Sequence, residues 1–107
     1  MRLFDTARRE VVDFTPGVHV KMYVCGVTPY DATHLGHAFT FITYDVLIRR
    51  LMDTGRTVQC VRNVTDVDDP LFAKARELDM HYLDLAAREE QRLEADLQAL
   101  NFVPMAS

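Results

Sequence analysis

Two histidines on either side of a glycine-containing dipeptide are the residues of this chain whose types and spacing point most directly to chemistry. His34 and His37 are separated by Leu35 and Gly36, and the apolar residues that follow have helical spacing. Side chains three apart project from nearly the same helix face, and a first helical turn has unpaired N–H groups and a positive dipole end. The pattern predicts a phosphate site that both imidazoles contact, with Gly36 leaving room for the ligand. A helix N-terminal hydrogen bond and a partly buried imidazole are the two structural alternatives.

More candidate residues lie just before the histidines and after a later strand. Cys25 and Gly26 close an alternating apolar run, and Gly26 lets the backbone leave that run sharply. Thr28 and Thr65 each follow a predicted strand, at the carboxyl edge where open α/β sheets bind ligands. For these threonines the alternative is turn capping, and for Cys25 it is a buried structural cysteine.

The elements that must position these residues form one strand–helix–strand unit. Residues 18–25 alternate as a strand, residues 34–53 have helical spacing, and residues 57–64 read as a second strand. Gly55 stands where a left-handed C-cap is expected. This order predicts an α/β fold with two parallel strands in a right-handed βαβ unit.

The central helix is apolar nearly all round, so we expect it to be covered on two faces. We expect the first face to bury Leu35, Phe39, Ile42, Val46 and Ile48, with Phe41, Tyr44, Leu47 and Leu51 on the other sides.

Shorter elements flank this unit. Residues 3–14 suggest an N-terminal hairpin. Asp68 and Asp69 precede Pro70, which predicts a helix that begins there and runs to about residue 78. Residues 83–100 predict an amphipathic helix. We expect that helix to bury Leu83, Ala86, Leu93, Leu97 and Leu100, with Glu90 as a polar misfit.

Composition favours one globular domain over residues 1–107 and excludes several classes. The 107 residues are 49% hydrophobic and 26% charged, and the net charge of −4 argues against a large basic surface for a nucleic-acid backbone. We find no signal-peptide core and no membrane-length apolar run, and expect a cytoplasmic protein. In that compartment Cys25 and Cys60 should not form a disulfide, and the acceptor triplet at Asn63 should not be glycosylated.

The motif residues resemble a known family. His34-Leu35-Gly36-His37 is similar to the His-Ile-Gly-His signature of class I aminoacyl-tRNA synthetases. The run MYVCGVTPYDATHLGHA followed by RNVTDVDD resembles their cysteine-activating branch, which contains cysteinyl-tRNA synthetase and the cysteine ligase of mycothiol synthesis. His37 and the Asp68-Asp69-Pro70-Leu71 run are closer to the mycothiol ligase. The resemblance covers nearly all of residues 2–104.

This resemblance implies a Rossmann-like half-domain that activates L-cysteine with ATP and Mg²⁺ and passes it to the amine of glucosaminyl-inositol, or alternatively to tRNA. It implies that His34 and His37 act on the α-phosphate, that Gly26 and Gly36 help to bind ATP or the adenylate, and that Gly26, Thr28 and Thr65 line the cysteine pocket. It also implies that Cys25 is one Zn²⁺ ligand, and zinc selects sulfur over the serine hydroxyl.

The further zinc ligands and a lysine-rich signature loop of these enzymes have no counterpart in these residues. We therefore expect the amino-terminal half of a catalytic domain, which needs a carboxy-terminal half or self-associates. Two other hypotheses are a truncated, inactive paralogue that serves as a nucleotide-binding or partner module, and a small zinc module built from Cys25, His34 and His37.

Overall fold

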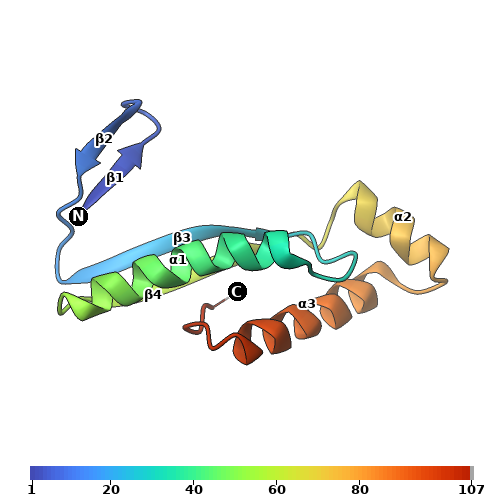
Figure 1. Ribbon diagram of the computed structural model, residues 1–107. Helices are drawn as coiled ribbons and strands as arrows, with labels where there is room; N and C mark the ends of the chain where they lie inside the picture. The colour runs from blue at the N-terminus through green and yellow to red at the C-terminus, as the bar shows by residue number, and fades with distance from the viewer. Residues whose placement is uncertain (107) are drawn as a thin grey trace.

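The computed structural model describes residues 1–106, which form an elongated molecule of 50 × 31 × 22 Å (Figure 1). The elements in chain order are β1 (Arg2–Asp5), β2 (Glu10–Asp13), β3 (His19–Val27), α1 (Leu35–Asp53), β4 (Thr57–Val64), α2 (Asp69–Glu77) and α3 (Tyr82–Ala99).

The predicted βαβ unit is confirmed. Strands β3 and β4 pair in parallel, with His19 opposite Thr57 and Met22 opposite Cys60, and α1 connects them. This Rossmann-like arrangement brings the carboxyl ends of both strands to one edge. Strand β4 has the predicted bounds, whereas β3 begins after Val18, which is 64% exposed, and continues to Val27.

The predicted N-terminal hairpin is also confirmed. Strands β1 and β2 pair antiparallel, with Arg2 opposite Asp13 and Asp5 opposite Glu10. Asp5 Oδ1 accepts hydrogen bonds from the backbone N–H groups of Ala7 and Arg8 at 2.9 and 3.1 Å, which stabilises the turn. In Figure 1 this hairpin stands apart from the β3–β4 sheet, so it does not take part in positioning the candidate site.

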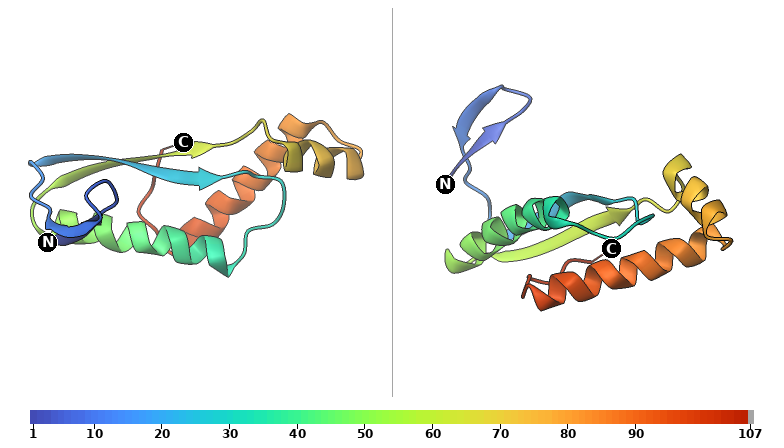
Figure 2. Two further views of the ribbon diagram at one scale, coloured as in Figure 1. Left: turned by 90° about the horizontal axis from the view of Figure 1, so that it is seen from above. Right: turned by 45° about the vertical axis from the view of Figure 1, so that its right-hand side comes forward.

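The main core lies on one face of the β3–β4 sheet. Helices α1 and α3 both lie on that side of the strands in the left view of Figure 2. The residues buried there are Val24, Phe41, Ile48, Cys60, Leu93 and Leu97. Their burial joins the first strand, the central helix, the second strand and the last helix into one packed unit.

The predicted buried face of α1 is largely wrong. Leu35 and Phe39 are 87% and 74% exposed, and Ile42 and Val46 are exposed as well. The buried residues of α1 are Phe41, Asp45, Ile48 and Leu51, of which Ile48 alone stood in the predicted set. In a helix that is apolar nearly all round the pattern cannot select the face, and packing on the sheet and α3 selects it here.

Helix α2 begins where the aspartate–proline pattern predicts. Asp68 is the N-cap and its side chain accepts from the Asp69 N–H, with Pro70 in the first turn. Leu71 and Ala75 of this helix pack against Leu85 and Ala86 of α3 in a second small core.

The buried face of α3 differs in part from the predicted one. Ala86, Leu93 and Leu97 are buried as expected, but Leu83 and Leu100 are exposed. Glu89, and not Glu90, is the buried acidic residue, and Leu85 is buried too. The helix packs first on α2 and then on the sheet, so its buried stripe shifts between two cores rather than following one line.

The segment after α3 returns to the sheet. Asp45 is 5% exposed, and its Oδ1 accepts from the Val103 N–H at 2.7 Å while Oδ2 pairs with Arg49 Nε at 2.7 Å. Ala106 then forms a parallel bridge with Val61. Ala106 thus lies beside β4 in the parallel direction, where a third strand of the sheet would lie. Among residues 1–106, no helix is long and apolar enough to cross a membrane.

Candidate functional site

His34 and His37 lie at the N-terminus of α1, as predicted, and their rings face each other. His34 is the N-cap, and the two ring centroids are 4.0 Å apart with the planes tilted by 33°. The strand-to-helix loop brings them to the carboxyl side of β3. The structure therefore gathers the two imidazoles into one group.

Each imidazole uses its Nδ1 atom to accept a backbone hydrogen bond. The Gly36 N–H donates to His34 Nδ1 at 3.0 Å, and the His34 N–H donates to His37 Nδ1 at 3.1 Å, which forms a reciprocal capping box. A ring nitrogen that accepts cannot carry a hydrogen, so each neutral ring carries its hydrogen on Nε2. The structural alternative of an N-terminal hydrogen bond is therefore realised, and the Nε2–H groups still offer donors to an anion.

The electrostatic setting favours the neutral form of His37. Burial lowers the pKa of His37 below its ordinary value, and the neighbouring His34 lowers it further. A neutral ring keeps both the Nδ1 acceptor that caps the helix and the Nε2–H donor. His37 is thus suited to donate a hydrogen bond rather than to act as a fixed positive charge.

Gly36 has a different local role from the predicted one. A Cβ at this position would lie 2.8 Å from His34 Cε1 and 2.9 Å from His34 Nδ1. The missing side chain makes room for the ring of His34, so that the ring can reach back to cap the helix. The first-turn N–H groups that we expected to be unpaired are also partly satisfied, because the imidazoles accept from two of the backbone N–H groups there.

A bulge at the end of the sheet sets the geometry around Cys25 and Gly26. The register shifts between Val24, which pairs with Arg62, and Val27, which pairs with Val64. Two residues of β3 thus stand against one residue of β4. A bulge of this kind directs a strand end away from the sheet, here toward the loop that leads to His34.

Asn63 is the residue of β4 that faces this bulge, and it connects two predicted pocket residues. The Gly26 N–H donates to Asn63 Oδ1 at 2.8 Å, and Asn63 Nδ2 donates to Thr65 Oγ1 at 3.2 Å. A Cβ on Gly26 would lie 1.8 Å from the Asn63 carbonyl oxygen, so the two strands approach closely here. In the strand sequence Asn63 is only a polar residue within a glycosylation triplet, and that pattern does not indicate its contacts with Gly26 and Thr65.

Thr28 and Thr65 lie directly after β3 and β4, at the shared edge where they were predicted. Thr28 Oγ1 donates to Asp68 Oδ2 at 3.1 Å, and the Thr65 N–H donates to the Val27 carbonyl at 3.2 Å. Both threonines therefore contribute to the turns, as the capping alternative stated, while their hydroxyl oxygens remain at the edge. Asp68 caps α2 and belongs to the same edge.

The two cysteines are far from equivalent. Both are free thiols, with Cys25 exposed and Cys60 buried. Burial raises the pKa of the Cys60 thiol, and Arg62 opposes that rise only in part. The expected lack of a disulfide agrees with this placement, and Cys25 alone presents its sulfur at the surface.

The part of the chain that the structure describes contains no group of three or more His, Cys, Asp or Glu side chains placed to hold a metal. The structure therefore does not assemble Cys25, His34 and His37 into the small zinc module that we considered. A zinc site normally has four ligands, so the described residues do not by themselves fit that ion.

A cleft of about 410 Å³ opens beside the two imidazoles, between the start of α1 and the later half of α3. Its polar residues are Thr33, His34, His37 and Asp96, and Leu93, Leu97 and Leu100 are among its apolar residues. It has the mixture of apolar walls and a few polar groups that is typical of ligand sites. Sequence reasoning did not anticipate that α3 forms one wall.

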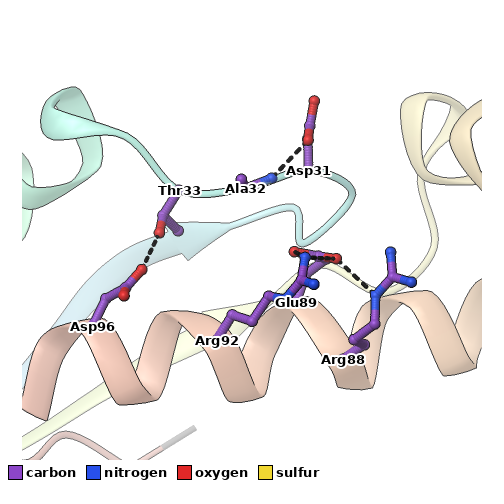
Figure 3. A network of polar contacts seen from close by, with 7 residues as sticks. All are labelled: Asp31, Ala32, Thr33, Arg88, Glu89, Arg92 and Asp96. Carbon is purple, nitrogen blue, oxygen red and sulfur yellow. Dashed lines mark hydrogen bonds and ion pairs between the residues drawn. The ribbon is translucent and has the colours of Figure 1, made fainter.

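Side-chain contacts tie the loop before α1 to α3. Figure 3 shows Thr33 pointing toward Asp96, and Thr33 Oγ1 donates to Asp96 Oδ2 at 2.7 Å. Buried Glu89 of the same helix pairs with Arg88 and Arg92 at 2.9 and 3.0 Å. The contact between Thr33 and Asp96 joins residues 63 positions apart, and local sequence patterns carry no signal for it.

Comparisons with known proteins agree with this geometry. Residues 11–107 match the family described as the catalytic domain of class I (C) tRNA synthetases. The chain is 53% identical over 104 residues to the L-cysteine:1D-myo-inositol 2-amino-2-deoxy-alpha-D-glucopyranoside ligase of Mycolicibacterium smegmatis, covering 97% of this chain and 25% of that protein. It is 52% identical over 102 residues to the ligase of the same name from Acidothermus cellulolyticus, covering 95% of this chain and 25% of the relative.

The chain spans about a quarter of the length of these curated relatives. The matched residues contain the βαβ unit, the histidine pair at the N-terminus of α1 and the threonines at the sheet edge. By sequence and by fold, the chain belongs to the family of class I (C) tRNA synthetase catalytic domains, a family of cysteine-activating ligases.

Proposed function

We propose that residues 1–107 are the amino-terminal half of a class I catalytic domain that uses ATP to activate L-cysteine for transfer to the amine of glucosaminyl-inositol. The names and identities of the relatives support this substrate assignment. The observation that carries it is the paired N-cap imidazoles, whose Nε2–H groups stay available beside a cleft at the carboxyl side of the parallel strands.

The proposed reaction has two steps. A carboxylate oxygen of cysteine attacks the α-phosphorus of ATP, the bond to the β-phosphate oxygen breaks, and pyrophosphate leaves with Mg²⁺. The amine nitrogen of the acceptor then attacks the carbonyl carbon of the cysteinyl-adenylate. AMP leaves with the bonding electrons, the nitrogen loses a proton, and an amide forms.

His34 and His37 are assigned to the first step. Negative charge grows on the α-phosphate oxygens as the carboxylate attacks, and two Nε2–H donors fixed by their Nδ1 hydrogen bonds meet that charge without rearranging. Gly36 takes part by giving the His34 ring its position. Preorganised donors of this kind lower the barrier more than they strengthen the binding of ATP.

The cysteine pocket is assigned to the sheet edge. Gly26 approaches the ligand through its backbone, and the Thr28 and Thr65 hydroxyls lie after the two strands that meet there. Asn63 joins the list as the side chain that holds Gly26 and Thr65 in place. The exposed Cys25 thiol is one candidate Zn²⁺ ligand in the longer protein, and no step is assigned to zinc from this chain alone.

The remaining part of the longer protein is the proposed partner of this segment. The exposed apolar side of α1, which carries Leu35, Phe39, Ile42 and Val46, has no cover within residues 1–106. The relatives are about four times longer than this chain, and the rest of their chain can supply that cover. Without it, the segment should associate with itself through this surface.

The deciding experiment uses the full-length protein that contains this chain. We expect cysteine-dependent exchange between ATP and pyrophosphate, and formation of an amide with glucosaminyl-inositol. His34→Ala and His37→Ala should each lower the exchange rate about 100-fold or more while leaving the Kd for cysteine nearly unchanged, since each removes a donor needed mainly in the transition state.

His81→Ala is the matched control. His81 is an exposed histidine that caps α3 in the same way, through Nδ1 and the Leu83 N–H, but it does not line the cleft. Its loss should leave the exchange rate unchanged. Transfer of cysteine to tRNA in place of glucosaminyl-inositol would reassign the acceptor, and a full-length protein with no exchange activity would favour a binding or partner module.

A further inference from the structure

The hydrogen bond between Thr28 and Asp68 fixes the polarity of one hydroxyl at the sheet edge. Thr28 Oγ1 donates to Asp68 Oδ2 at 3.1 Å, and both residues are half-buried. A hydroxyl has one hydrogen, and a carboxylate only accepts. The hydrogen of Thr28 is therefore committed to Asp68, and the Thr28 oxygen has lone pairs alone to offer to a ligand.

Asp68 cannot easily turn away from this contact. Its other oxygen, Oδ1, accepts from the Asp69 N–H at 2.9 Å and so caps α2. Rotation of the carboxylate would uncap that helix and leave the Asp69 N–H without its acceptor. The two oxygens of one carboxylate thus connect the start of α2 to the end of β3.

The second hydroxyl at this edge has the opposite arrangement. Thr65 Oγ1 accepts from Asn63 Nδ2 at 3.2 Å. The orientation of that amide is fixed, because its oxygen accepts from the Gly26 N–H at 2.8 Å. Thr65 therefore keeps its hydrogen for donation, so the acceptor character of Thr28 is a specific property and not a general feature of the edge.

We propose that Asp68 is a positioning residue that makes Thr28 an acceptor for the α-ammonium group of the amino-acid substrate. An ammonium group has three donors and no acceptor, so it matches a hydroxyl oxygen that presents only lone pairs. The Asp68 carboxylate behind Thr28 adds electrostatic attraction. The inference rests on the proposed function, and it assigns the ammonium end of cysteine to the β3 side of the edge.

Asp68→Asn in the full-length protein is the test. Asn caps helices as well as Asp does, so the oxygen of the new side chain can keep the Asp69 N–H. Its NH₂ group then faces Thr28 Oγ1 and reverses the hydroxyl, which turns its hydrogen toward the ligand. Since hydrogen bonds to charged groups contribute about 1.5–3 kcal/mol, we expect KM for cysteine to rise by about 10-fold or more, with kcat and the urea midpoint nearly unchanged.

Asp69→Asn is the matched control, because it removes the same charge from the adjacent, exposed residue of the same helical turn. It should leave KM for cysteine unchanged. In a Thr28→Val background, Asp68→Asn should have no further effect. An equal rise in KM for Asp69→Asn, or an additive double variant, would overturn the inference.

Binding measured by calorimetry separates this inference from the proposed function. Asp68→Asn should weaken binding of L-cysteine but not of 3-mercaptopropionate, which lacks the ammonium group. Equal loss for the two ligands, or an unchanged Kd for cysteine, overturns the role of Asp68 even if the wild type exchanges pyrophosphate. Asp68-dependent cysteine binding without any exchange overturns the proposed reaction alone, and a wild type that binds no cysteine overturns both.

Discussion

The two sides of α1 carry similar residue types but have opposite environments. Phe41 is 1% exposed and packs with the sheet and α3, whereas Phe39, two residues earlier on the same helix, is 74% exposed. The inner side also carries the buried Asp45, and the outer side carries Ile42 and Val46. Hydrophobicity alone would rank the outer side as the better core.

The difference shows that partners, and not composition, decide which side of a helix is a core. On the inner side, Asp45 is buried because Arg49 and the Val103 N–H satisfy its two oxygens. On the outer side, apolar residues have no cover within residues 1–106. A surface of this kind is typical of an interface with another segment or chain.

The largest expected difference between the two sides of α1 comes from removing a phenyl ring from each of them. Phe41→Ala should lower the free energy of unfolding by about 3–5 kcal/mol, because it leaves a cavity in the core, and it also removes the ring that lies 5.9 Å from the Arg62 guanidinium. Phe39→Ala is the matched control and should change the free energy of unfolding by less than about 0.5 kcal/mol. Urea denaturation of the two variants measures the contrast, and equal losses would contradict the packing described.

Two aspartates of α1, one buried and one exposed, give a smaller difference in the free energy of unfolding. Asp45→Ala should destabilise the chain by about 1–3 kcal/mol, since it leaves the Val103 N–H without its acceptor in a half-buried setting. Asp53 on the same helix pairs with Arg50 where both side chains are well exposed, 75% and 60%. Asp53→Ala should therefore cost about 0–1 kcal/mol. Urea midpoints test this, and a larger loss for Asp53→Ala would reverse the assignment.

The smallest effect belongs to His37, which is half-buried in the first turn of α1. Burial and His34 lower its pKa in the folded state, so the unfolded chain binds the proton more readily. Its stabilising contribution is complete above pH 6.5, the ordinary pKa value, and is lost as the pH falls through the lower folded pKa. Protonation also removes the Nδ1 acceptor for the His34 N–H.

Urea midpoints of the wild type and His37→Asn, measured from pH 8 to pH 5, test this dependence. The advantage of the wild type should shrink as the solution becomes acidic. A constant difference, or one that grows toward acid, would show that the folded state does not favour neutral His37.

Local signals were enough to predict most of the secondary structure. The bounds of β4, the start of α1 near His34 and the start of α2 after Asp68 followed from alternation, capping residues and the Asp-Asp-Pro run. The places of Gly26, Thr28, His34 and His37 on the fold were predicted in the same way, because these residues lie in one continuous segment. Their assigned roles in catalysis and binding stay predictions.

What the sequence could not predict depends on contacts between distant residues. The buried side of α1 depends on α3, and Glu89 rather than Glu90 lies on the buried side of α3, where Arg88 and Arg92 pair with it. Asn63 gained its role from a bulge in the opposite strand, and Asp96 gained its role from a loop that is close only after folding. Periodicity within one segment has no information on such pairs.

The close approach of the strands at Gly26 also limits how this protein can change by mutation. Every other amino acid has a Cβ, and at this position that atom would collide with the backbone of Asn63, which no change of rotamer relieves. At Gly17, where a Cβ would meet nothing within 4 Å, replacements meet no such obstacle. In a library of random variants selected for folding, the codon for residue 26 should therefore stay glycine while the codon for residue 17 drifts.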